Sequence, residues 1–258
     1  MTGTDQFSLR GRVAVVVGGA GGIGAAIAAG LAKAGAILVI ADLELQACES
    51  VTAEIVRQDG KATPFALDIC DEGAVEVAFA NFAQRYGRLD ILVNSAGTTR
   101  RASALNQTLA DWDRVMSVNT TGVFLACRAA ARHMIPLGGG AIVNIASIMG
   151  LSGGGLYPNI SYQTSKGAIV NMTRSLALEW AANGIRVNAI APTWVRTDFI
   201  KGIVENPQLL LARVEAMIPL GRLAEPEDIV GAALFLASPA ASMVTGHILA
   251  VDGGFLAQ

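Results

Sequence analysis

The sequence has 258 residues, 52% of them hydrophobic and 16% charged, with 19 basic against 21 acidic residues and a formal net charge of -2. This length fits one large α/β domain, and the near balance of charge excludes the strongly basic surface that nucleic acid or an anionic membrane would attract. The first residues, MTGTDQFSLRGR, contain no apolar core of a secretory signal. Cys48, Cys70 and Cys127 have no CxxC spacing, so we expect reduced thiols, a cytoplasmic protein and a small-molecule partner.

The first strongly apolar segment, residues 13–32, has no charged residue and is long enough to span a bilayer. Five glycines crowd its middle, at positions 18, 19, 21, 22 and 24. Its first half is β-branched and its second half is rich in alanine. Because glycines would weaken a membrane helix there, the segment predicts a buried strand, a tight turn and a buried helix.

Apolar runs typical of strands recur along the whole chain, separated by segments that favour helices. The runs are RVAVVV, AILVIA, ATPFALD, LDILVN, AIVNIA, IRVNAIA and HILAVD. Helices are expected at about residues 22–34, 43–58, 72–86, 109–134, 162–182 and 226–237. Continuous apolar strands favour a parallel sheet covered on both faces. The sequence therefore predicts a single-domain, doubly wound (Rossmann) sheet of about seven strands over residues 1–258.

Ligands of such a sheet bind beyond the carboxyl ends of its strands. Three irregular stretches, residues 97–108, 148–161 and 193–225, are expected to lie there. Long connections inside a compact domain are usually functional. The stretch at about 193–225 is the candidate for a substrate lid.

The cofactor end is predicted from VAVVVGGAGGIG, in which a strand runs into Gly18 and a helix opens at Gly22 and Gly24. Such a turn lets the backbone approach a pyrophosphate at a helix N-terminus. The next strand ends in Asp42, where a carboxylate can accept hydrogen bonds from ribose hydroxyls and repel a 2′-phosphate. No Lys or Arg lies in the turn, so NAD is expected rather than NADP. Asp42 could instead cap the following helix.

The catalytic end is predicted from Ser147, which closes a strand, and from Tyr162 and Lys166, which are four positions apart and share one helix face. An ammonium group and a cationic nicotinamide beside Tyr162 would favour its phenolate over the phenol, whose ordinary pKa is about 10. Tyr162 could then exchange the hydroxyl proton of a substrate while hydride moves to or from the cofactor. Alone, a Tyr–Lys pair at this spacing more often forms a solvated face.

The order of the motifs along the chain favours a catalytic Tyr162–Lys166 pair over a solvated helix face. The glycine turn, Asp42, the NSAG sequence at residues 94–97, Asn119, Ser147, Tyr162, Lys166 and the segment 192–197 follow one another along the chain. In this order the chain resembles the short-chain dehydrogenase/reductase family over nearly its whole length. The resemblance implies that Ser147 binds the substrate oxygen, Tyr162 is the acid/base, Lys166 holds the nicotinamide ribose, and Asn119 anchors a water that relays protons to Lys166.

The resemblance also implies the residues around the cofactor and the substrate. Asn94 would support the central strand, Asp68 would contact the adenine, and residues 190–197 would surround the nicotinamide. The expected cofactor-binding residues are Gly18, Gly22, Ile23, Gly24, Asp42, Asp68, Ile69, Asn94, Ala96, Gly97, Tyr162, Lys166, Pro192, Val195 and Thr197. The expected substrate residues are Ser147, Asn159, Tyr162 and Trp194.

The sequence departs from the family pattern at three positions: Val17 replaces a Thr, Ser95 an Asn, and Thr193 the Gly that usually follows the proline. Ser147 and Tyr162 are 15 positions apart (162 minus 147), two more than the commonest spacing. None of these departures removes a reacting group, so the expected chemistry is unchanged. The longer interval implies a longer substrate loop, which affects the expected shape of the substrate.

Other functions are weighed against the same residues. A Ser–His–Asp hydrolase is disfavoured because His133 and His247 are the only histidines and neither follows a nucleophile-elbow sequence; no catalytic metal is expected either. A 3-oxoacyl-thioester reductase shares the architecture, but Asp42 disfavours NADP and the uncharged segments 134–141 and 180–185 offer no basic surface to an acidic carrier protein. A non-catalytic NAD-binding regulator would not need the intact set of reacting groups.

Within the family, the sequence is similar to bacterial polyol and sugar-alcohol dehydrogenases, notably in NSAG, in the long interval before Tyr162 and in the ending SPAASMVTGHILAVDGG. This similarity implies an NAD-dependent exchange between a secondary alcohol, expected to be a polyol or sugar alcohol, and its ketone. The family also implies a homotetramer. Arg100 and Arg101 follow NSAG, and one of them could reach an anionic substrate group, although such pairs are more often solvated.

Overall fold

The middle layer of the protein is a seven-stranded sheet, seen in a computed structural model that describes residues 5–154, 156–200 and 210–258. The strands are β1 (Val13–Val17), β2 (Ile37–Asp42), β3 (Lys61–Ala66), β4 (Ile91–Asn94), β5 (Gly140–Ile145), β6 (Ile185–Pro192) and β7 (Ile248–Val251). All neighbouring pairs are parallel, in the order β3-β2-β1-β4-β5-β6-β7. The predicted doubly wound sheet is confirmed. The strand order reverses between β1 and β4, where such sheets bind ligands.

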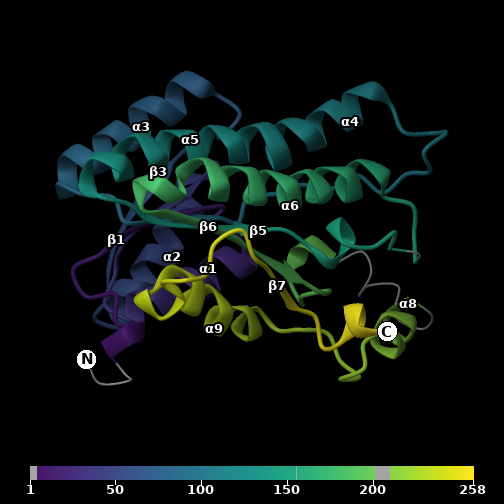
Figure 1. The fold of residues 1–258 in the computed structure, drawn as a ribbon. Coiled ribbons are helices and arrows are strands. Elements are labelled where there is room, and N and C mark those ends of the chain that lie inside the picture. Colours follow the sequence, from purple (N-terminus) through teal and green to yellow (C-terminus); the bar gives the residue numbers. More distant parts are fainter. Residues whose placement is uncertain (1–4, 155, 201–209) are drawn as a thin grey trace.

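Helices cover both faces of this sheet (Figure 1). The helices are α1 (Gly22–Lys33), α2 (Leu45–Arg57), α3 (Glu72–Tyr86), α4 (Leu109–Met116), α5 (Val123–Met134), α6 (Ile160–Trp180), α8 (Leu210–Ala216) and α9 (Pro226–Ala237). In Figure 1, α3, α5 and α6 lie above the strands, and α1, α2 and α9 lie below them. Separate hydrophobic cores fill the two sides.

The helix boundaries differ from the sequence expectation in three places. The helix expected over residues 109–134 is divided into α4 and α5 by a π-helical segment, Ser117–Gly122, which contains Asn119. The second helix begins at Leu45 rather than 43, because Glu44 is its N-cap. The helix expected from 162 begins at Ile160, so Tyr162 lies in its first turn. Hydrophobic periodicity predicts the length of a helix well, but not a single extra residue inserted in a turn.

The apolar segment 13–32 forms β1, a turn and the first part of α1, as predicted. At the turn, Gly18 has a φ of +74°, and a Cβ there would lie 2.2 Å from the backbone nitrogen of Ala96. Only glycine satisfies both conditions, because it tolerates positive φ and has no side chain. In the described part of the chain, no helix is long and apolar enough to cross a bilayer.

A third, smaller hydrophobic core lies beyond the sheet. Its buried members are Ile148, Met149, Trp194, Ile200, Val214, Ile218 and Leu223, and Tyr157, Tyr162, Phe255 and Leu256 pack against them. These residues come from the loops after β5 and β6, from the start of α6, from α8 and the segment that follows it, and from the C-terminal turn. The chain ends beside α8 in Figure 1, and Gln258 Nε2 donates a hydrogen bond to the carbonyl of Met217. This core walls one end of the candidate site.

Candidate active site

A cavity of about 900 Å³ opens at the carboxyl ends of the central strands. Its walls come from the glycine turn after β1 and from the segments that follow β2, β3, β4, β5 and β6. All three irregular stretches singled out from the sequence contribute lining residues. One end is formed by the glycine turn, and the other by the third hydrophobic core.

The glycine turn presents backbone N–H groups to the cavity. No side chain caps α1, and its first turn holds no acidic residue, so the N–H groups there are available to an external acceptor. A Cβ at Gly22 would lie 2.5 Å from Thr197 Cγ2, and one at Gly24 would lie 2.1 Å from the carbonyl oxygen of Gly18. Close backbone approach at the N-terminus of a helix fits a phosphate group. The turn therefore fits the pyrophosphate of a dinucleotide.

Asp42 ends β2 and faces the same cavity. One carboxylate oxygen accepts the Ala20 N–H at 3.1 Å and the other accepts the Leu43 N–H at 2.8 Å. Because Glu44 is the N-cap of α2, the alternative that Asp42 caps this helix is wrong. Each carboxylate oxygen keeps a second acceptor position. Asp42 is thus held by two backbone bonds and can still accept from a pair of ribose hydroxyls.

Lys166 and Tyr162 lie on one face of α6, with the ammonium nitrogen 5.6 Å from the centre of the phenol ring. Lys166 is 5% exposed. Its Nζ donates a 2.6 Å hydrogen bond to the carbonyl of Ile145, at the end of β5. Burial lowers the pKa of Lys166 from 10.5 to about 8. The group is therefore a buried cation held by a carbonyl.

Tyr162 has a pKa raised to about 12, since burial disfavours the phenolate more than a hydrogen bond with Ser147 favours it. The sequence predicts a phenolate favoured by the ammonium group of Lys166 together with a cationic nicotinamide, whereas burial in the protein alone raises the pKa. The difference arises because periodicity places Lys166 beside the ring but does not reveal how deeply the hydroxyl lies. A cation next to the hydroxyl is the kind of group that lowers such a pKa.

Ser147 lies directly after β5 and is 7% exposed. Its Oγ accepts a 3.1 Å hydrogen bond from the Met149 N–H. Together with its hydrogen bond to Tyr162, this contact fixes the Ser147 hydroxyl next to the phenol. Two hydroxyl groups therefore converge at one point of the cavity, which is the arrangement needed to bind a single alcohol or ketone oxygen.

Asn119 is fully buried behind the cavity. Its Nδ2 donates to the carbonyl of Thr98 at 2.9 Å and to Ser165 Oγ at 3.0 Å, and its Oδ1 accepts the Thr98 N–H at 2.7 Å. A Cβ at Gly97 would lie 3.5 Å from Asn119 Oδ1 and 3.8 Å from Lys166 Nζ. Both N–H groups of Asn119 Nδ2 are used. The water that the sequence analysis expects at Asn119 would therefore have to donate to one of its oxygen atoms.

Asn159 and Trp194, the further substrate residues predicted from the sequence, line the same cavity. Asn159 is 6% exposed, and its amide is within 3.1 Å of Thr99 Oγ1, which joins the loop after β4 to the start of α6. Trp194 Nε1 donates to the Tyr157 hydroxyl at 3.1 Å, and its ring packs edge-on against Phe255. This end of the cavity combines an apolar wall with a few fixed polar groups.

Most of the predicted site residues line one cavity. Those that do are Gly18, Gly22, Ile23, Asp42, Asp68, Ile69, Ala96, Gly97, Ser147, Asn159, Tyr162, Lys166, Pro192, Trp194, Val195 and Thr197. Gly24, Asn94 and Asn119 do not. Asn94 instead donates to Asn144 Oδ1 at 2.9 Å, inside the core. In the described structure, Gly24 serves the close packing of the glycine turn and Asn94 the bonding between strands; their expected cofactor contacts stay predictions.

Several lining residues had no role assigned from the sequence: Thr99, Met149, Tyr157 and Phe199. Thr193 also lines the cavity, and the sequence analysis named it as a departure from the family pattern within residues 190–197. Of the arginine pair, Arg101 lines the cavity, with its guanidinium 5.2 Å from the centre of the Tyr157 ring, and Arg100 forms an ion pair with Asp111. Both arginines are exposed.

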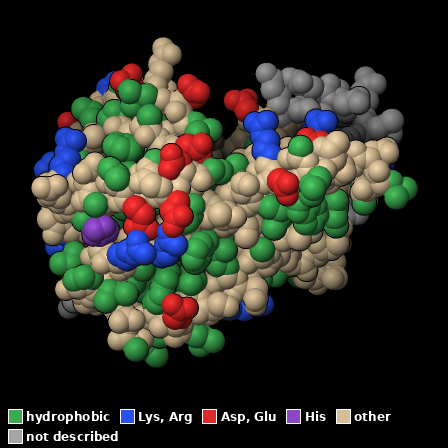
Figure 2. All heavy atoms as spheres, turned by 90° about the horizontal axis from the view of Figure 1, so that it is seen from above, with side chains coloured by type: hydrophobic (Ala, Val, Ile, Leu, Met, Phe, Trp, Pro, Cys, Tyr) green, Lys and Arg blue, Asp and Glu red, His purple; other side chains and the backbone are tan. Residues whose placement is uncertain are grey.

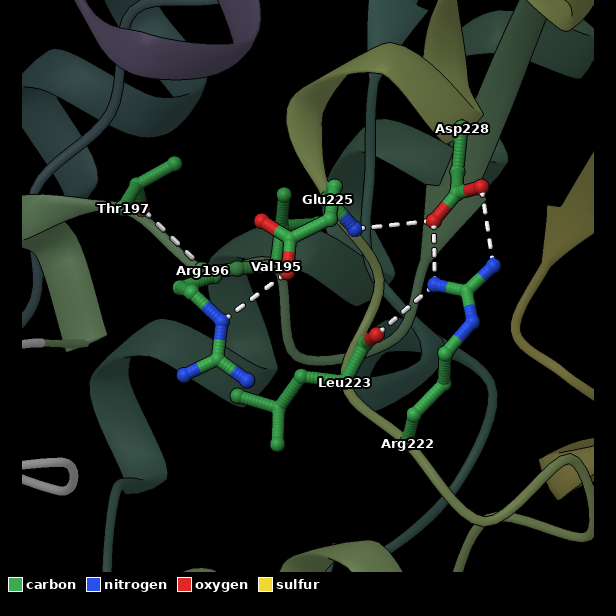
Figure 3. Close-up of polar contacts among 7 residues, drawn as sticks. All are labelled: Val195, Arg196, Thr197, Arg222, Leu223, Glu225 and Asp228. Carbon is green, nitrogen blue, oxygen red and sulfur yellow. Dashed lines mark hydrogen bonds and ion pairs between the residues drawn. The ribbon is translucent and has the colours of Figure 1, made fainter.

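The candidate lid, 193–225, has described parts at 193–200 and 210–225, and residues 201–209 lie outside the described structure. Figure 3 shows its two ends side by side. Arg196 donates its backbone N–H to the carbonyl of Ala224 at 2.8 Å and its side chain to Glu225 at 2.9 Å. Arg222 makes two bonds to Asp228, at 2.6 and 3.0 Å. The base of the candidate lid is thus anchored to the start of α9.

The described residues contain no group of three His, Cys, Asp or Glu side chains that could hold a metal ion. His133 and His247 lie on α5 and just before β7.

Comparison with known proteins agrees with this geometry. A family model described as enoyl-(acyl carrier protein) reductase matches residues 18–256. D-threitol dehydrogenase of Mycolicibacterium smegmatis is 41% identical, over 97% of this chain and 95% of its own. Galactitol 2-dehydrogenase (L-tagatose-forming) of Cereibacter sphaeroides is 44% identical, over 96% of each chain. The solved structure of a gluconate 5-dehydrogenase from Burkholderia cenocepacia, in complex with NADP and tartrate, is 35% identical with a TM-score of 0.95, over 99% of each chain.

Proposed function

Because the chain belongs to the short-chain dehydrogenase/reductase family and is therefore an oxidoreductase acting on CH–OH groups, we propose that it is a cytoplasmic, NAD-dependent dehydrogenase of a polyol or sugar alcohol. The convergence of Ser147, Tyr162 and Lys166 on one cavity wall carries this proposal. The two most identical relatives reported above act, by their names, on a tetritol and a hexitol.

The proposed mechanism assigns one task to each reacting group. Ser147 Oγ binds the oxygen of the carbinol and holds it beside the Tyr162 hydroxyl. Tyr162 accepts the hydroxyl proton during oxidation and returns it during reduction. Lys166, whose Nζ lies 5.6 Å from the centre of the Tyr162 ring, is assigned a positive charge that favours the phenolate against the effect of burial. Arg101 also lowers the pKa of Tyr162. A bound nicotinamide would supply the hydride acceptor.

The preference for NAD rests on Asp42. Its carboxylate lies in the cavity next to the glycine turn, where a 2′-phosphate would face a negative charge. The gluconate 5-dehydrogenase structure contains NADP, so members of the family differ in this choice. We assign NAD to this chain because Ala20 and Leu43, the neighbours bonded to Asp42, carry no positive charge.

The proposed polyol substrate is supported by the polar groups at the far end of the cavity. Thr99 and Asn159 bind each other and can each accept or donate one further bond. Trp194 forms an apolar wall opposite them in the same cavity. A substrate with several hydroxyl groups and a carbon backbone satisfies both kinds of surface. We further propose that residues 193–225 close over it as a lid of this single-domain enzyme.

A homotetramer is proposed for the assembly. Figure 2 views the molecule from above, on the side where Figure 1 places α3, α5 and α6, and its hydrophobic side chains are mixed with charges of both signs. Leu178 on α6 is 83% exposed and Phe124 on α5 is 37% exposed. These two long helices are the ones through which members of the family usually pair, and this analogy is the support for the proposal. Sedimentation of a monomer at micromolar concentration would contradict the proposal.

The test of function is nicotinamide reduction by the purified protein with NAD and with NADP, across sugar alcohols, vicinal diols and simple secondary alcohols. We expect turnover with NAD and vicinal polyols. NADPH-driven reduction of acetoacetyl thioesters, with no oxidation of any alcohol, would establish the acyl-reductase alternative instead. Binding of NAD without turnover of any substrate would support the regulator.

A further inference from the structure

Arg101 places a guanidinium group in the wall of the cavity without an acidic partner. The residue lies in the loop between β4 and α4, lines the cavity and is exposed. Within residues 5–154, 156–200 and 210–258 it forms no ion pair, and its one hydrogen bond runs from Nη2 to the carbonyl of Phe199 at 3.3 Å. The neighbouring Arg100, by contrast, is paired with Asp111 at 3.3 Å and does not line the cavity.

Two aromatic residues of the cavity wall hold the guanidinium group in place. Its Cζ lies 5.2 Å from the centre of the Tyr157 ring, within the range of a cation–π contact, and the Phe199 carbonyl accepts from Nη2. The Tyr157 hydroxyl is itself fixed by a 3.1 Å hydrogen bond from Trp194 Nε1. A ligand that binds a freely rotating arginine must also order it, which opposes binding. For Arg101, part of that ordering is already present in the fold.

The same neighbours place Arg101 beside the proposed acid/base. The ring of Phe199 lies 5.7 Å from the ring of Tyr162, centre to centre, so Phe199 contacts both the phenol and the guanidinium group. The positive charge of Arg101 lowers the pKa of Tyr162, although burial outweighs this effect. Tyr157 and Tyr162 both pack against the third hydrophobic core, and the glycine turn forms the other end of the cavity. A group bound to Arg101 therefore belongs to the substrate rather than to the pyrophosphate of the cofactor.

The donors left on Arg101 fit a carboxylate. A guanidinium group has five N–H donors, and one of them is used. The others lie in one plane, where they can form two parallel hydrogen bonds to the two oxygens of a carboxylate. One guanidinium group balances the single charge of a carboxylate, whereas a phosphate monoester carries almost two charges.

Nothing else in the described cavity neutralises this cation. Three acidic residues line the same cavity, and within the described part of the chain none of them forms an ion pair with Arg101: Asp42, Asp68 and Asp198. Apolar side chains of the third hydrophobic core line the cavity near Tyr157. A substrate that displaces water there would strengthen an ion pair with Arg101, because the local dielectric constant falls.

We propose that Arg101 is a specificity-determining residue whose guanidinium group binds a carboxylate of the substrate, so that polyhydroxy acids are preferred over neutral sugar alcohols. This inference rests on the proposed oxidation of polyols and narrows it to polyols that carry a carboxylate. Ser147 and Tyr162 bind the reacting oxygen, and Arg101 fixes the charged end of the carbon chain.

The experiment compares sugar acids with neutral molecules of the same carbon chain and configuration. D-Gluconate is measured beside D-gluconamide and D-glucitol, and D-galactonate beside D-galactonamide and galactitol, each with NAD. The amide resembles the acid in size and differs in charge. Because hydrogen bonds to charged groups are the stronger ones, kcat/KM of the wild type for the acid should exceed that for its amide by about tenfold to a hundredfold.

Three variants assign this preference to one side chain. Arg101→Met removes the charge, and the preference for the acid should fall below about threefold through a higher KM for the acid. Since Arg101 also lowers the pKa of Tyr162, this variant should be slower on every substrate, and the ratio of acid to amide cancels that common factor. Arg101→Lys keeps the charge without the planar fork and should show an intermediate preference. Arg100→Met is the matched control and should keep the full preference, because Arg100 pairs with Asp111 outside the cavity.

Four results would overturn the assignment. They are equal kcat/KM of the wild type for acid and amide, an unchanged preference in Arg101→Met, an equal loss of preference in Arg100→Met, and a change in Arg101→Met confined to the KM for NAD, which would place the guanidinium group on the cofactor. A higher kcat/KM for D-glucitol 6-phosphate than for either acid would contradict the choice of a carboxylate.

Failure of the proposed function is distinguishable from failure of this inference. A wild type that oxidises neither the acids nor the neutral polyols with NAD removes both. A wild type that oxidises the neutral polyols and not the acids removes only the role of Arg101.

Discussion

The two ends of the sheet treat buried charge in opposite ways. At the amino end, Asp90 precedes β4 and accepts four hydrogen bonds: two from Arg88, at 2.6 and 2.7 Å, one from Arg12 at 2.7 Å and one from the Val13 N–H at 2.8 Å. Burial by itself raises the pKa of Asp90, but these bonds outweigh it and hold the pKa below its usual value. At the carboxyl end, Lys166 donates to the Ile145 carbonyl, its one hydrogen-bond partner among the described residues, and burial lowers its pKa to about 8.

A half-buried cation at the amino end, Arg186, is also bonded within the fold, although burial still lowers the pKa of its guanidinium group. Arg186, near the start of β6, donates to the carbonyls of Leu236 at 2.8 Å and Ser238 at 3.1 Å, at the end of α9. These carbonyls have no partners within the helix and carry its negative dipole. The guanidinium group of Arg186 therefore bonds the free carbonyls at the C-terminus of α9 and compensates their negative charge.

The two ends of the sheet therefore differ in role: charged groups at the amino end stabilise the fold, and those at the carboxyl end are candidates for the reaction. Groups at the amino end are paired within the fold, so their loss should reduce stability and spare activity. Groups at the carboxyl end keep unsatisfied charge and hydroxyl capacity, so their loss should reduce activity and spare or improve stability. Strained or underpaired groups are expected where a protein must bind or react.

The largest expected effect is on the reaction. Tyr162→Phe removes the proton acceptor without changing the ring, and general acid–base groups contribute about 10²- to 10⁴-fold. We expect kcat/KM to fall by that factor with no loss of thermal stability. Tyr86→Phe is the matched control, since the hydroxyl of Tyr86 bonds Thr63 far from the cavity. Equal activity of wild type and Tyr162→Phe would refute the acid/base assignment.

The next effect is on stability at the amino end. Asp90→Asn leaves Arg12 and Arg88 without their carboxylate, and breaking such pairs costs about 2–4 kcal/mol when the arginines are partly exposed. Urea unfolding should report this loss at neutral pH, with steady-state activity retained. The pKa of Asp90 in the folded protein lies below its usual value. The difference in unfolding free energy between wild type and Asp90→Asn should therefore shrink as the pH falls from the usual pKa of Asp toward this lower value, because the carboxylate becomes protonated. Glu54→Gln, at an exposed pair with Arg57, should leave the midpoint unchanged.

Lys166→Met should make the protein inactive and more stable. Lys166 has a pKa of about 8 in the folded chain against 10.5 ordinarily, so the penalty for holding the ammonium group is complete below pH 8 and fades as the pH rises to 10.5. The unfolding free energy of the variant should exceed that of the wild type by roughly 3 kcal/mol at pH 7. This difference should shrink between pH 8 and 10.5. Denaturant unfolding of both proteins at pH 7, 9 and 10.5 measures the difference. A variant that is less stable at pH 7 would mean that the ammonium group stabilises the fold.

The smallest effect concerns the cofactor. Asp42→Ser removes a charge but keeps an acceptor, so we expect the KM for NAD to rise about tenfold and the preference for NAD over NADP to fall. Glu44→Gln removes a nearby charge that does not line the cavity and should change neither. A preference for NADP in the wild type would show that the carboxylate does not select against the 2′-phosphate.

Much of the site could be predicted because its motifs are local. Neighbouring residues indicate the turn at Gly18, the end of β2 at Asp42 and the helical spacing of Tyr162 and Lys166. All four residues line one cavity. Contacts between distant residues were missed. Thr99 and Asn159 are 60 positions apart, and Trp194 and Tyr157 are 37 apart. No pattern within either loop indicates its partner.

The sequence by itself determined the order of strands and helices along the chain and the glycine turn, because backbone preferences and hydrophobic periodicity act over a few residues. It also indicated the candidate reacting groups, through the order of their motifs. Tertiary structure alone decided the raised pKa of Tyr162, the lowered pKa of Lys166 and the contacts of Arg101 with Tyr157 and Phe199. Each of these depends on how much water and which partners remain after packing, and packing is fixed by segments far apart in the chain.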